Sequence, residues 1–535
     1  MFDYIGNSFY FTFILWAGIL TPSSLLFLFL FSVSSIKASR EHATVKHLPW
    51  IGRRPQLFAS IRANYRGFIK SVELYISGYR MYSKKNQTYV APTWTKGPQV
   101  ILPPSYGNWI ASTPDALLNA KDCTFENAQF AYTVGHPEIT SNDMIDVLIK
   151  RELTRTIGSL NNEILEEIDA SMVDIFGTSG EWVDVGVFDS LTRTVGRAVN
   201  RIFVGEELCS DMNYLMAGIR FARDVSVSSY ILHAFPKFMK PFVTLFASYP
   251  NRREARTCMK YLEPLIAERI ENMQRKEHDP SYAWEAPEDF ITWMVRESFK
   301  RNTEDERSVY ALAYRIVLLQ FAAITTTTIT STNALLDIWS APNAEEVVEF
   351  LREEATRVLA EHNGEWSKAA LAKLYRLDSA VRESSRVSGI GGTALARKVK
   401  ADNGITLPDG IWLPKGTTVG VSMDGIHFDE EFYKDPLTFD AFRFSRPRED
   451  PSYDEKGVNE DLVTTSPHWL TFSHGIHACP GRHFAVNNIK MTLAHLLLNY
   501  DVKPFDTRPP NVQIGDLSVI PVKARMSVKR RQVKV

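Results

Sequence analysis

The sequence predicts a mainly α-helical protein with small β-sheets, an α+β fold, behind an N-terminal transmembrane helix. Helical periodicity of apolar residues dominates from about residue 140 to 390. Strand-like pieces occur near residues 70 to 102, near 405 to 422, and at the C-terminus. From residue 4 to 36, by contrast, the chain carries no charged side chain at all.

The composition beyond that apolar stretch is that of an ordinary globular chain. The 535 residues include 61 Lys and Arg against 62 Asp and Glu, which excludes a strongly basic nucleic-acid binder. The four cysteines, Cys123, Cys209, Cys258 and Cys479, stand singly, without Cys-x-x-Cys spacing. That pattern argues against a disulfide framework and against a cysteine-rich zinc module. We therefore expect a body in a reducing compartment, with no nucleic-acid partner.

The uncharged N-terminal stretch is longer than the ~20 residues that cross the hydrocarbon core of a bilayer. Basic residues follow it directly, which places the body on the cytoplasmic side: Lys37, Arg40, Lys46, Arg53 and Arg54. A cleaved signal peptide is disfavoured, because a basic start and a small-residue cleavage site are missing. The Thr-Pro-Ser-Ser run at 21–24 leaves a kinked or partly interfacial helix open. We assign residues 1–40 to a membrane anchor and its flank, 41–55 to a proline-rich connector, and 56–535 to a single catalytic domain.

A long central helix is expected from about Thr303 to Trp339. Thr303 and Glu306 have the spacing of a capping box, and Pro342 marks the end. The unusual feature is the run TTTTITST at 325–332, because a threonine hydroxyl competes for the carbonyl four residues earlier. These threonines are either packing residues or the site of a local opening, with one hydroxyl turned toward a reacting group.

A second helix is expected at 375–389, where Glu383 and Arg386, three residues apart, share a face. Such pairs are usually exposed and worth little. Arg443, however, lies among phenylalanines in TFDAFRFSRP (438–447), where a guanidinium needs a buried partner. Glu383 is the best available candidate.

Two segments read as β-structure. The Pro and Gly punctuation of LPDGIWLPKGTTVGV (407–421) predicts a hairpin, and the alternation in PVKARMSVKRR (521–531) predicts an edge strand with a basic end.

The segment TFSHGIHACPGRHFA (471–485) carries the metal chemistry. Four side chains are possible zinc ligands: His474, His477, Cys479 and His483. The same segment also reads as one thiolate in a glycine-punctuated loop that leads into a helix.

Taken together, these segments resemble membrane-bound eukaryotic cytochrome P450s, most closely the filamentous-fungal secondary-metabolism branch. Phe472, Gly475, Cys479 and Gly481 match the F-x-x-G-x-x-x-C-x-G haem loop. Glu383 and Arg386 match the E-x-x-R helix, and Arg443 stands where the family completes a Glu-Arg-Arg cluster. The run AAITTT at 322–327 matches the oxygen-binding motif of the central helix.

The resemblance implies a P450 fold in which the central helix lies over haem b and Cys479 is the axial ligand of its iron. Backbone N–H groups should point at the sulfur, with Gly475 and Gly481 permitting the tight path and Phe472 packing on that side of the macrocycle. Thr326 matches the threonine that holds dioxygen, and Thr325 stands where the family has an acid. His477 and Arg397 are expected at the haem propionates. From IKRELTR (149–155), Arg151 is the preferred third contact, with Lys150 and Arg155 as alternatives. Glycines in GIGGTALA (389–396), where the family has a proline, suggest an altered substrate pocket.

As function, the resemblance implies a monooxygenase of the endoplasmic reticulum membrane, single-pass, with a cytoplasmic body. It would oxidise a hydrophobic small molecule, a terpenoid or related metabolite. NADPH would supply electrons through NADPH–cytochrome P450 reductase, with cytochrome b5 as a second donor. A haem–thiolate isomerase or dehydratase that needs no reductase is the alternative within the same fold. A zinc-binding or structural membrane protein is the alternative outside it.

Overall fold

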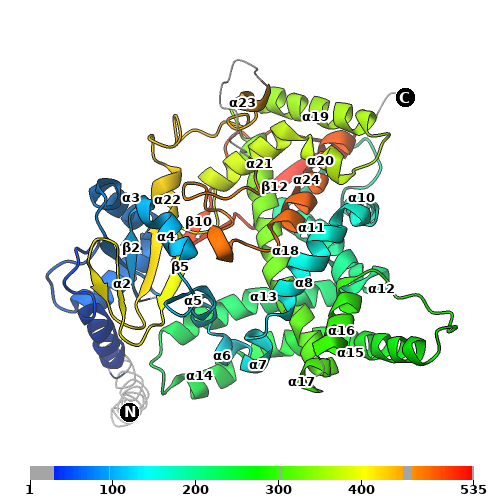
Figure 1. The fold of residues 1–535 in the computed structure, drawn as a ribbon. Helices are drawn as coiled ribbons and strands as arrows, with labels where there is room; N and C mark the ends of the chain where they lie inside the picture. The colour runs from blue at the N-terminus through cyan, green and yellow to red at the C-terminus, as the bar shows by residue number, and fades with distance from the viewer. Residues whose placement is uncertain (1–28, 30, 96, 302–303, 450–460, 533–535) are drawn as a thin grey trace, which may run out of the picture.

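The 31-residue helix α18 (Val309–Trp339) runs through the middle of the helical part of the protein (Figure 1). This computed structural model describes residues 29, 31–95, 97–301, 304–449 and 461–532. Most of the predicted membrane anchor, residues 4–36, therefore lies outside the described residues. α18 packs against several helices from distant parts of the chain, and the apolar residues it buries belong to the main hydrophobic core.

The helices that pack around α18 or flank it are long. They are α10 (Asn161–Phe176), α11 (Val187–Val204), α13 (Met212–His233), α15 (Tyr249–His278), α16 (Phe290–Arg301), α19 (Ala344–Glu361), α21 (Tyr375–Val387) and α24 (Arg482–Asn499). Shorter helices near the N-terminal side are α2 (Ala59–Ile69), α3 (Ser71–Met81), α4 (Gly107–Ser112), α5 (Ala120–Asn127), α6 (Phe130–Thr133), α7 (Pro137–Thr140), α8 (Met144–Leu148) and α9 (Thr154–Thr156). The remaining short helices are α12 (Glu206–Cys209), α14 (Lys240–Ala247), α17 (Glu304–Arg307), α20 (Lys368–Ala372), α22 (Met423–His427) and α23 (Arg446–Glu449).

The largest sheet lies at one side of the molecule and has five strands in the order β1-β2-β8-β5-β3 (Figure 1). Its strands are β1 (Tyr89–Pro92), β2 (Pro98–Leu102), β8 (Thr418–Ser422), β5 (Thr393–Val399) and β3 (Leu118–Asn119). β2 and β8 are parallel, whereas the other neighbours are antiparallel. The connector also joins this sheet through Val90 of β1. The amide of Val90 donates to the carbonyl of Pro49 at 2.8 Å, and the carbonyl of Val90 accepts from the amide of Ile51 at 3.0 Å.

Three smaller sheets complete the fold. A three-stranded sheet has the order β4 (Val183–Gly186), β12 (Arg525–Arg530) and β9 (Tyr500–Val502). Two hairpins are formed by β6 (Ile405–Thr406) with β7 (Trp412–Leu413) and by β10 (Val512–Ile514) with β11 (Leu517–Val519). The predicted mainly α fold with small sheets is thus confirmed. The hairpin predicted over 407–421 is formed only in part, because β7 pairs with β6 at 405–406 and the end of the segment is β8 of the five-stranded sheet.

Some predicted details are wrong. The segment 71–81 is helix α3 and not a strand. β12 is the central strand of its sheet and not an edge, because it pairs with β4 on one side and β9 on the other. The central helix starts later than expected, at Val309, where Ser308 caps it, and the preceding turn forms the separate helix α17. Thr303 lies outside the described residues.

Within the described part of the chain, α18 is the one helix long and apolar enough to cross a membrane by length and composition. Because α11, α13, α15, α21 and α24 all pack on it, we interpret it as a core helix.

Candidate active site

The loop before α24 is built around Cys479. The amide of Cys479 donates to the carbonyl of Phe472 at 2.8 Å, and the amide of Ala478 donates to the carbonyl of Gly475 at 3.0 Å. Gly475 has φ +77°, and a Cβ there would come within 2.6 Å of the Cβ of Ala111. Only glycine fits this backbone position without strain. The loop is therefore held in a single tight path that ends at the cysteine.

Two opposing effects act on the pKa of the Cys479 thiol. Burial raises the pKa of the thiol, whereas backbone N–H groups of Gly481 and Arg482 and the Arg482 guanidinium favour the thiolate. α24 begins at Arg482, so its N-terminal dipole also favours negative charge at this point. The chain thus supplies donors to a sulfur that a bound metal would deprotonate. The sequence analysis did not predict a role for Arg482 at the sulfur, although this residue follows the cysteine by three positions.

Gly481 plays a different part from the one expected of it. Its φ of −85° is ordinary for any residue, so the backbone path does not need glycine here. A Cβ at Gly481 would meet no atom within 4 Å. The space beside Gly481, two residues after Cys479, is therefore open. Phe472 is half-buried and packs against the main core.

The three histidines of this segment have separate partners. His474 contacts the Thr465 hydroxyl at 3.0 Å, and His477 contacts the Asp115 carboxylate at 2.6 Å. His483 is exposed on α24. Among the described residues, no three His, Cys, Asp or Glu side chains converge as metal ligands. The geometry therefore does not support the zinc interpretation.

The middle of α18 exposes two small side chains on one face. Ala322 and Thr326 are exposed although most residues of this helix are buried. The Thr326 hydroxyl donates to the carbonyl of Ala322 at 2.8 Å, and Thr330 repeats this bond one turn later to the carbonyl of Thr326. Thr325 is half-buried beside it. The helix is continuous through this region, so the threonines bond back to the backbone without opening the helix.

The Glu383–Arg386–Arg443 cluster lies inside the protein. Arg386 binds the Glu383 carboxylate with two bonds of 2.9 and 2.8 Å, and both side chains are fully buried. Arg443 adds a bond from Nε to Oε1 of Glu383 at 3.0 Å. Arg386 also donates to the carbonyls of His427 and Pro436, each at 2.6 Å. The cluster thus ties α21 to the segment that precedes the cysteine loop.

Arg397 and His477 line one cavity of about 360 Å³, together with residues of the 389–396 segment. Arg397 is 3% exposed, and its Nη1 donates to the carbonyl of Ala396 at 3.0 Å. Its Nε and Nη2 have no hydrogen-bond partner among the described residues. Burial lowers the pKa of Arg397. A buried guanidinium with two unused donors fits an anionic oxygen ligand such as a carboxylate. Asp115, which contacts His477, is 362 positions away in sequence and left no signal there.

The structure places Arg151 elsewhere. Its side chain is 45% exposed and binds Glu297 at 2.7 Å and Glu152 at 2.8 Å. Arg155 also binds Glu152, while Lys150 is exposed on the same π-helical turn, η3 (Ile149–Leu153). Since two carboxylates already occupy the Arg151 guanidinium, we do not include Arg151 in the proposed site.

Comparison with known proteins identifies the family of this chain. A model of the cytochrome P450 family matches residues 147–528. This chain belongs to the cytochrome P450 family. The chain is 31% identical to cytochrome P450 monooxygenase gloP of Glarea lozoyensis over 90% of this chain and 91% of that protein. It is 32% identical to cytochrome P450 monooxygenase 71 of Postia placenta over 92% and 94%. Cytochrome P450 monooxygenase polB of Polytolypa hystricis is 29% identical over 92% and 94%.

The protein is accordingly a P450 oxidoreductase, and P450s carry a haem whose iron has a cysteine thiolate ligand. The residues on hand fit that group in three independent respects. The Cys479 sulfur receives backbone donors, the space at Gly481 is open, and Arg397 presents unused donors in a cavity that it shares with His477.

Proposed function

We propose that this P450 is a monooxygenase that oxidises a hydrophobic small molecule, a terpenoid or related fungal secondary metabolite. The observation that carries the proposal is the exposed Ala322–Thr326 face in the middle of α18, most of whose residues are buried. A hydroxyl there can hold and pass a proton at an oxygen atom, as a monooxygenase requires. The relatives named monooxygenases support the same reading.

Cys479 would hold the haem iron, and Arg397 and His477 would hold the propionates. Bound haem supplies dioxygen activation, which the thiolate ligand promotes by donating electron density. The backbone N–H groups of Gly481 and Arg482 stabilise the negative charge on the sulfur. The Thr326 hydroxyl would exchange its bond to the Ala322 carbonyl for one to an oxygen or a water in the site. Because Thr325 replaces the family's acid, a hydroxyl and water would pass protons at that position without a carboxylate.

The substrate pocket would include the 389–396 segment. Ile390, Ala394 and Leu395 line the same cavity as Arg397, together with Met423 and Leu470, so its walls are largely apolar. This lining favours a hydrophobic substrate.

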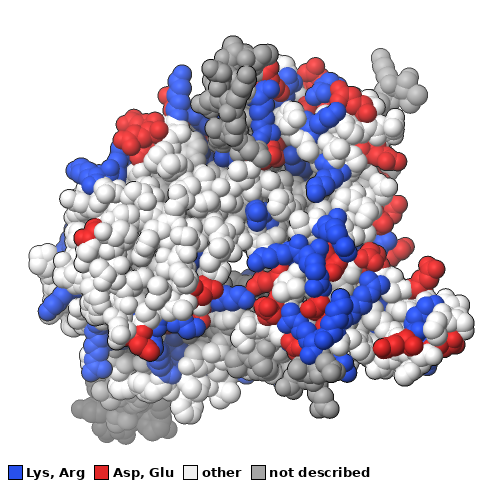
Figure 2. Space-filling view, viewed as in Figure 1, with Lys and Arg blue, Asp and Glu red and all other residues white. Residues whose placement is uncertain are grey.

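An electron donor would dock on a basic surface. Figure 2 shows Lys and Arg gathered over α8 and α16 on the face in view. Exposed residues of this surface include Lys150, Arg151 and Arg155, with Arg296 and Lys300 on the adjoining α16. Positive charge of this kind would steer a negatively charged flavoprotein reductase, or cytochrome b5, to the molecule. The uncharged N-terminal segment supports anchoring in the endoplasmic reticulum membrane with the body in the cytoplasm.

The test has two parts. Purified protein reduced under carbon monoxide should show the red-shifted Soret band of thiolate-ligated haem, and Cys479→Ala should abolish it. Metabolite profiling with a panel of terpenoid precursors should then give product only when reductase and NADPH are both present. Product formed without them would overturn the monooxygenase assignment in favour of a haem–thiolate isomerase or dehydratase.

A further inference from the structure

The short helix α14 turns its polar side chains toward the protein and its large apolar side chains toward the outside. Lys240 and Thr244, one turn apart, are each only 6% exposed and face the protein. The opposite face carries Phe242, Leu245 and Phe246, which are 72%, 59% and 83% exposed. Large apolar groups rarely gather on a surface that meets only water. This helix therefore presents its apolar face to something other than water.

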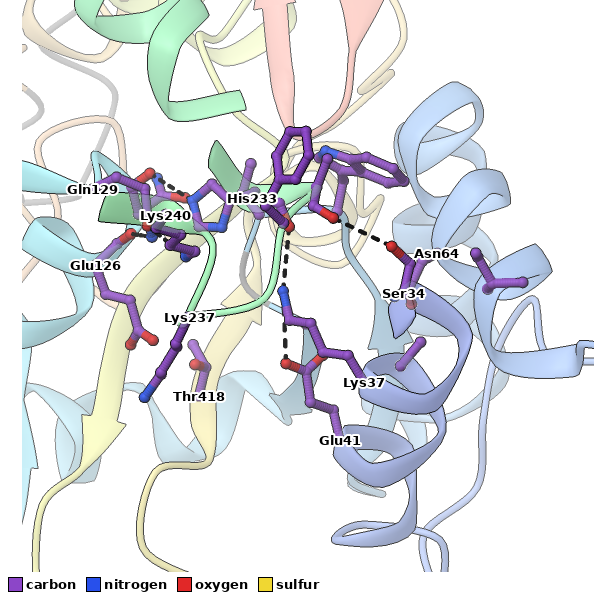
Figure 3. A pocket seen from close by; sticks show the side chains of 18 of the residues that line it. Ser34, Lys37, Glu41, Asn64, Glu126, Gln129, His233, Lys237, Lys240 and Thr418 are labelled. Atoms are coloured by element: carbon purple, nitrogen blue, oxygen red, sulfur yellow. Dashed lines mark hydrogen bonds and ion pairs between the residues drawn. The ribbon is translucent and has the colours of Figure 1, made fainter. Parts of the chain in front are cut away.

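A polar pocket of about 120 Å³ lies at the N-terminal end of this helix, where Lys240 and the preceding Lys237 line it. Figure 3 shows Lys37 and Glu41, from the helical segment 31–43, on one wall, and Lys237, Lys240 and Gln129 across from them. The two walls are joined by hydrogen bonds. Lys37 donates to the carbonyl of His233 at 3.2 Å, and Ser34 donates to the carbonyl of Ala234 at 3.3 Å. The helical segment 31–43, which includes the end of the predicted anchor and its basic flank, is thus docked against the end of α13, where the pocket lies.

The pocket has more positive charge than its own carboxylates balance. Glu41 pairs with Lys37 at 4.0 Å, and Glu126 pairs with Lys398 from β5. Neither Lys237 nor Lys240 has a carboxylate partner among the described residues, and the Lys240 amine donates to the neutral amide oxygen of Gln129 at 2.6 Å.

The pKa values of Lys240 and His233 agree with a pocket that lacks a negative group beside Lys240. Burial, reinforced by Lys37 and Lys237, lowers the pKa of Lys240 to about 8. His233 adds no charge near neutral pH, since burial lowers its pKa to about 4. A buried amine without a counter-ion is costly unless a negative group enters beside it.

We propose that this pocket binds the phosphate of an anionic phospholipid, with Lys237 and Lys240 as its ligands and the apolar face of α14 against the acyl chains. The proposal rests on the proposed membrane association. Two features favour a lipid over a free phosphate ion: the apolar face is on the same helix as Lys240, and the uncharged N-terminal segment leads into the opposite wall. The site would couple the anchor, α13 and α14 through one headgroup.

The test uses the full-length, haem-loaded protein in a mild non-ionic detergent, so that its outcome does not depend on the anchor. Titration calorimetry compares dihexanoyl phosphatidate, dihexanoyl phosphatidylcholine and inorganic phosphate. We expect phosphatidate to bind at least ten-fold more tightly than either of the others. Lys240→Met and Lys237→Gln should each weaken it ten-fold or more. Lys415→Gln, which changes an exposed lysine paired with Asp402, should not.

Each other outcome overturns the proposal. Equal binding of inorganic phosphate would show a free-anion site, and equal binding of phosphatidylcholine would show that the apolar face alone accounts for affinity. Unchanged binding in both lysine variants would place the lipid elsewhere. The carbon monoxide spectrum of each variant is the second readout. It should stay that of the unmodified protein, so loss of lipid binding is distinguished from loss of the haem site.

Discussion

Replacing Arg397 by methionine should affect the haem-free and the haem-loaded protein in opposite directions. Among the described residues, no protein group pairs with Nε or Nη2 of the buried Arg397 guanidinium, and these donors would lack partners in the haem-free protein. A buried donor left unsatisfied costs about 1–3 kcal/mol, so Arg397→Met should raise the stability of this form by about that amount. With haem bound, the same donors would make charge-assisted bonds to a propionate, worth about 1.5–3 kcal/mol. The variant should therefore lose haem affinity by about 10- to 150-fold.

Two measurements check this prediction. Thermal unfolding of haem-free protein gives the first effect, and the rate of haem transfer to excess apomyoglobin gives the second. Arg151→Met is the matched control, because its exposed guanidinium makes surface ion pairs worth about 0–1 kcal/mol. It should leave haem transfer unchanged. If Arg397→Met destabilises the haem-free form, or transfers haem at the unmodified rate, Arg397 does not bind a propionate.

Three further predictions follow from buried groups and from the cysteine loop. Glu383→Gln should lower the free energy of unfolding by about 3–5 kcal/mol, because it leaves buried arginines without their carboxylate. Denaturant unfolding measures this loss. Lys415→Gln serves as the control, and an equal loss in that variant would contradict the reasoning. Gly475→Ala should reduce the folding yield, because the positive φ of this residue alone costs about 1–2 kcal/mol for alanine and the added Cβ would also approach Ala111 closely. Gly481→Ala, by contrast, should fold normally yet retain less haem. The reverse pattern would refute the roles assigned to the two glycines. Burial, with Asp516 adding to it, raises the pKa of Asp424 from 3.8 to about 7. The stability that Asp424 contributes should be complete below about pH 4 and lost as pH rises toward 7, and pH-dependent unfolding of Asp424→Asn should lack that change.

The central helix and the strand-like character of residues 405–422 were predictable because local patterns determine them. Periodicity and length indicate α18, and a guanidinium among phenylalanines requires an acid, which made Glu383 the natural partner of Arg443. Burial of that pair could be inferred only by combining two distant segments.

Other features depend on contacts that no local pattern reveals. The alternation in β12 is the same whether one or both edges are paired, so its central position could not be read from it. The helix α3 carries β-favouring Val, Tyr and Ile, but its burial against the five-stranded sheet selects a helix. The partners of Arg151 lie partly on α16, 146 positions away. Its spacing in the sequence alone could not distinguish a cofactor ligand from a surface ion pair.

The central position of β12 has a consequence for the order in which the protein can form. During synthesis, β4 leaves the ribosome more than 300 residues before the strand that it pairs with, and β9 must also wait for β12. The sheet therefore cannot be completed until β12 has been made, and a chain that stops before β12 would leave β4 and β9 without the strand that joins them.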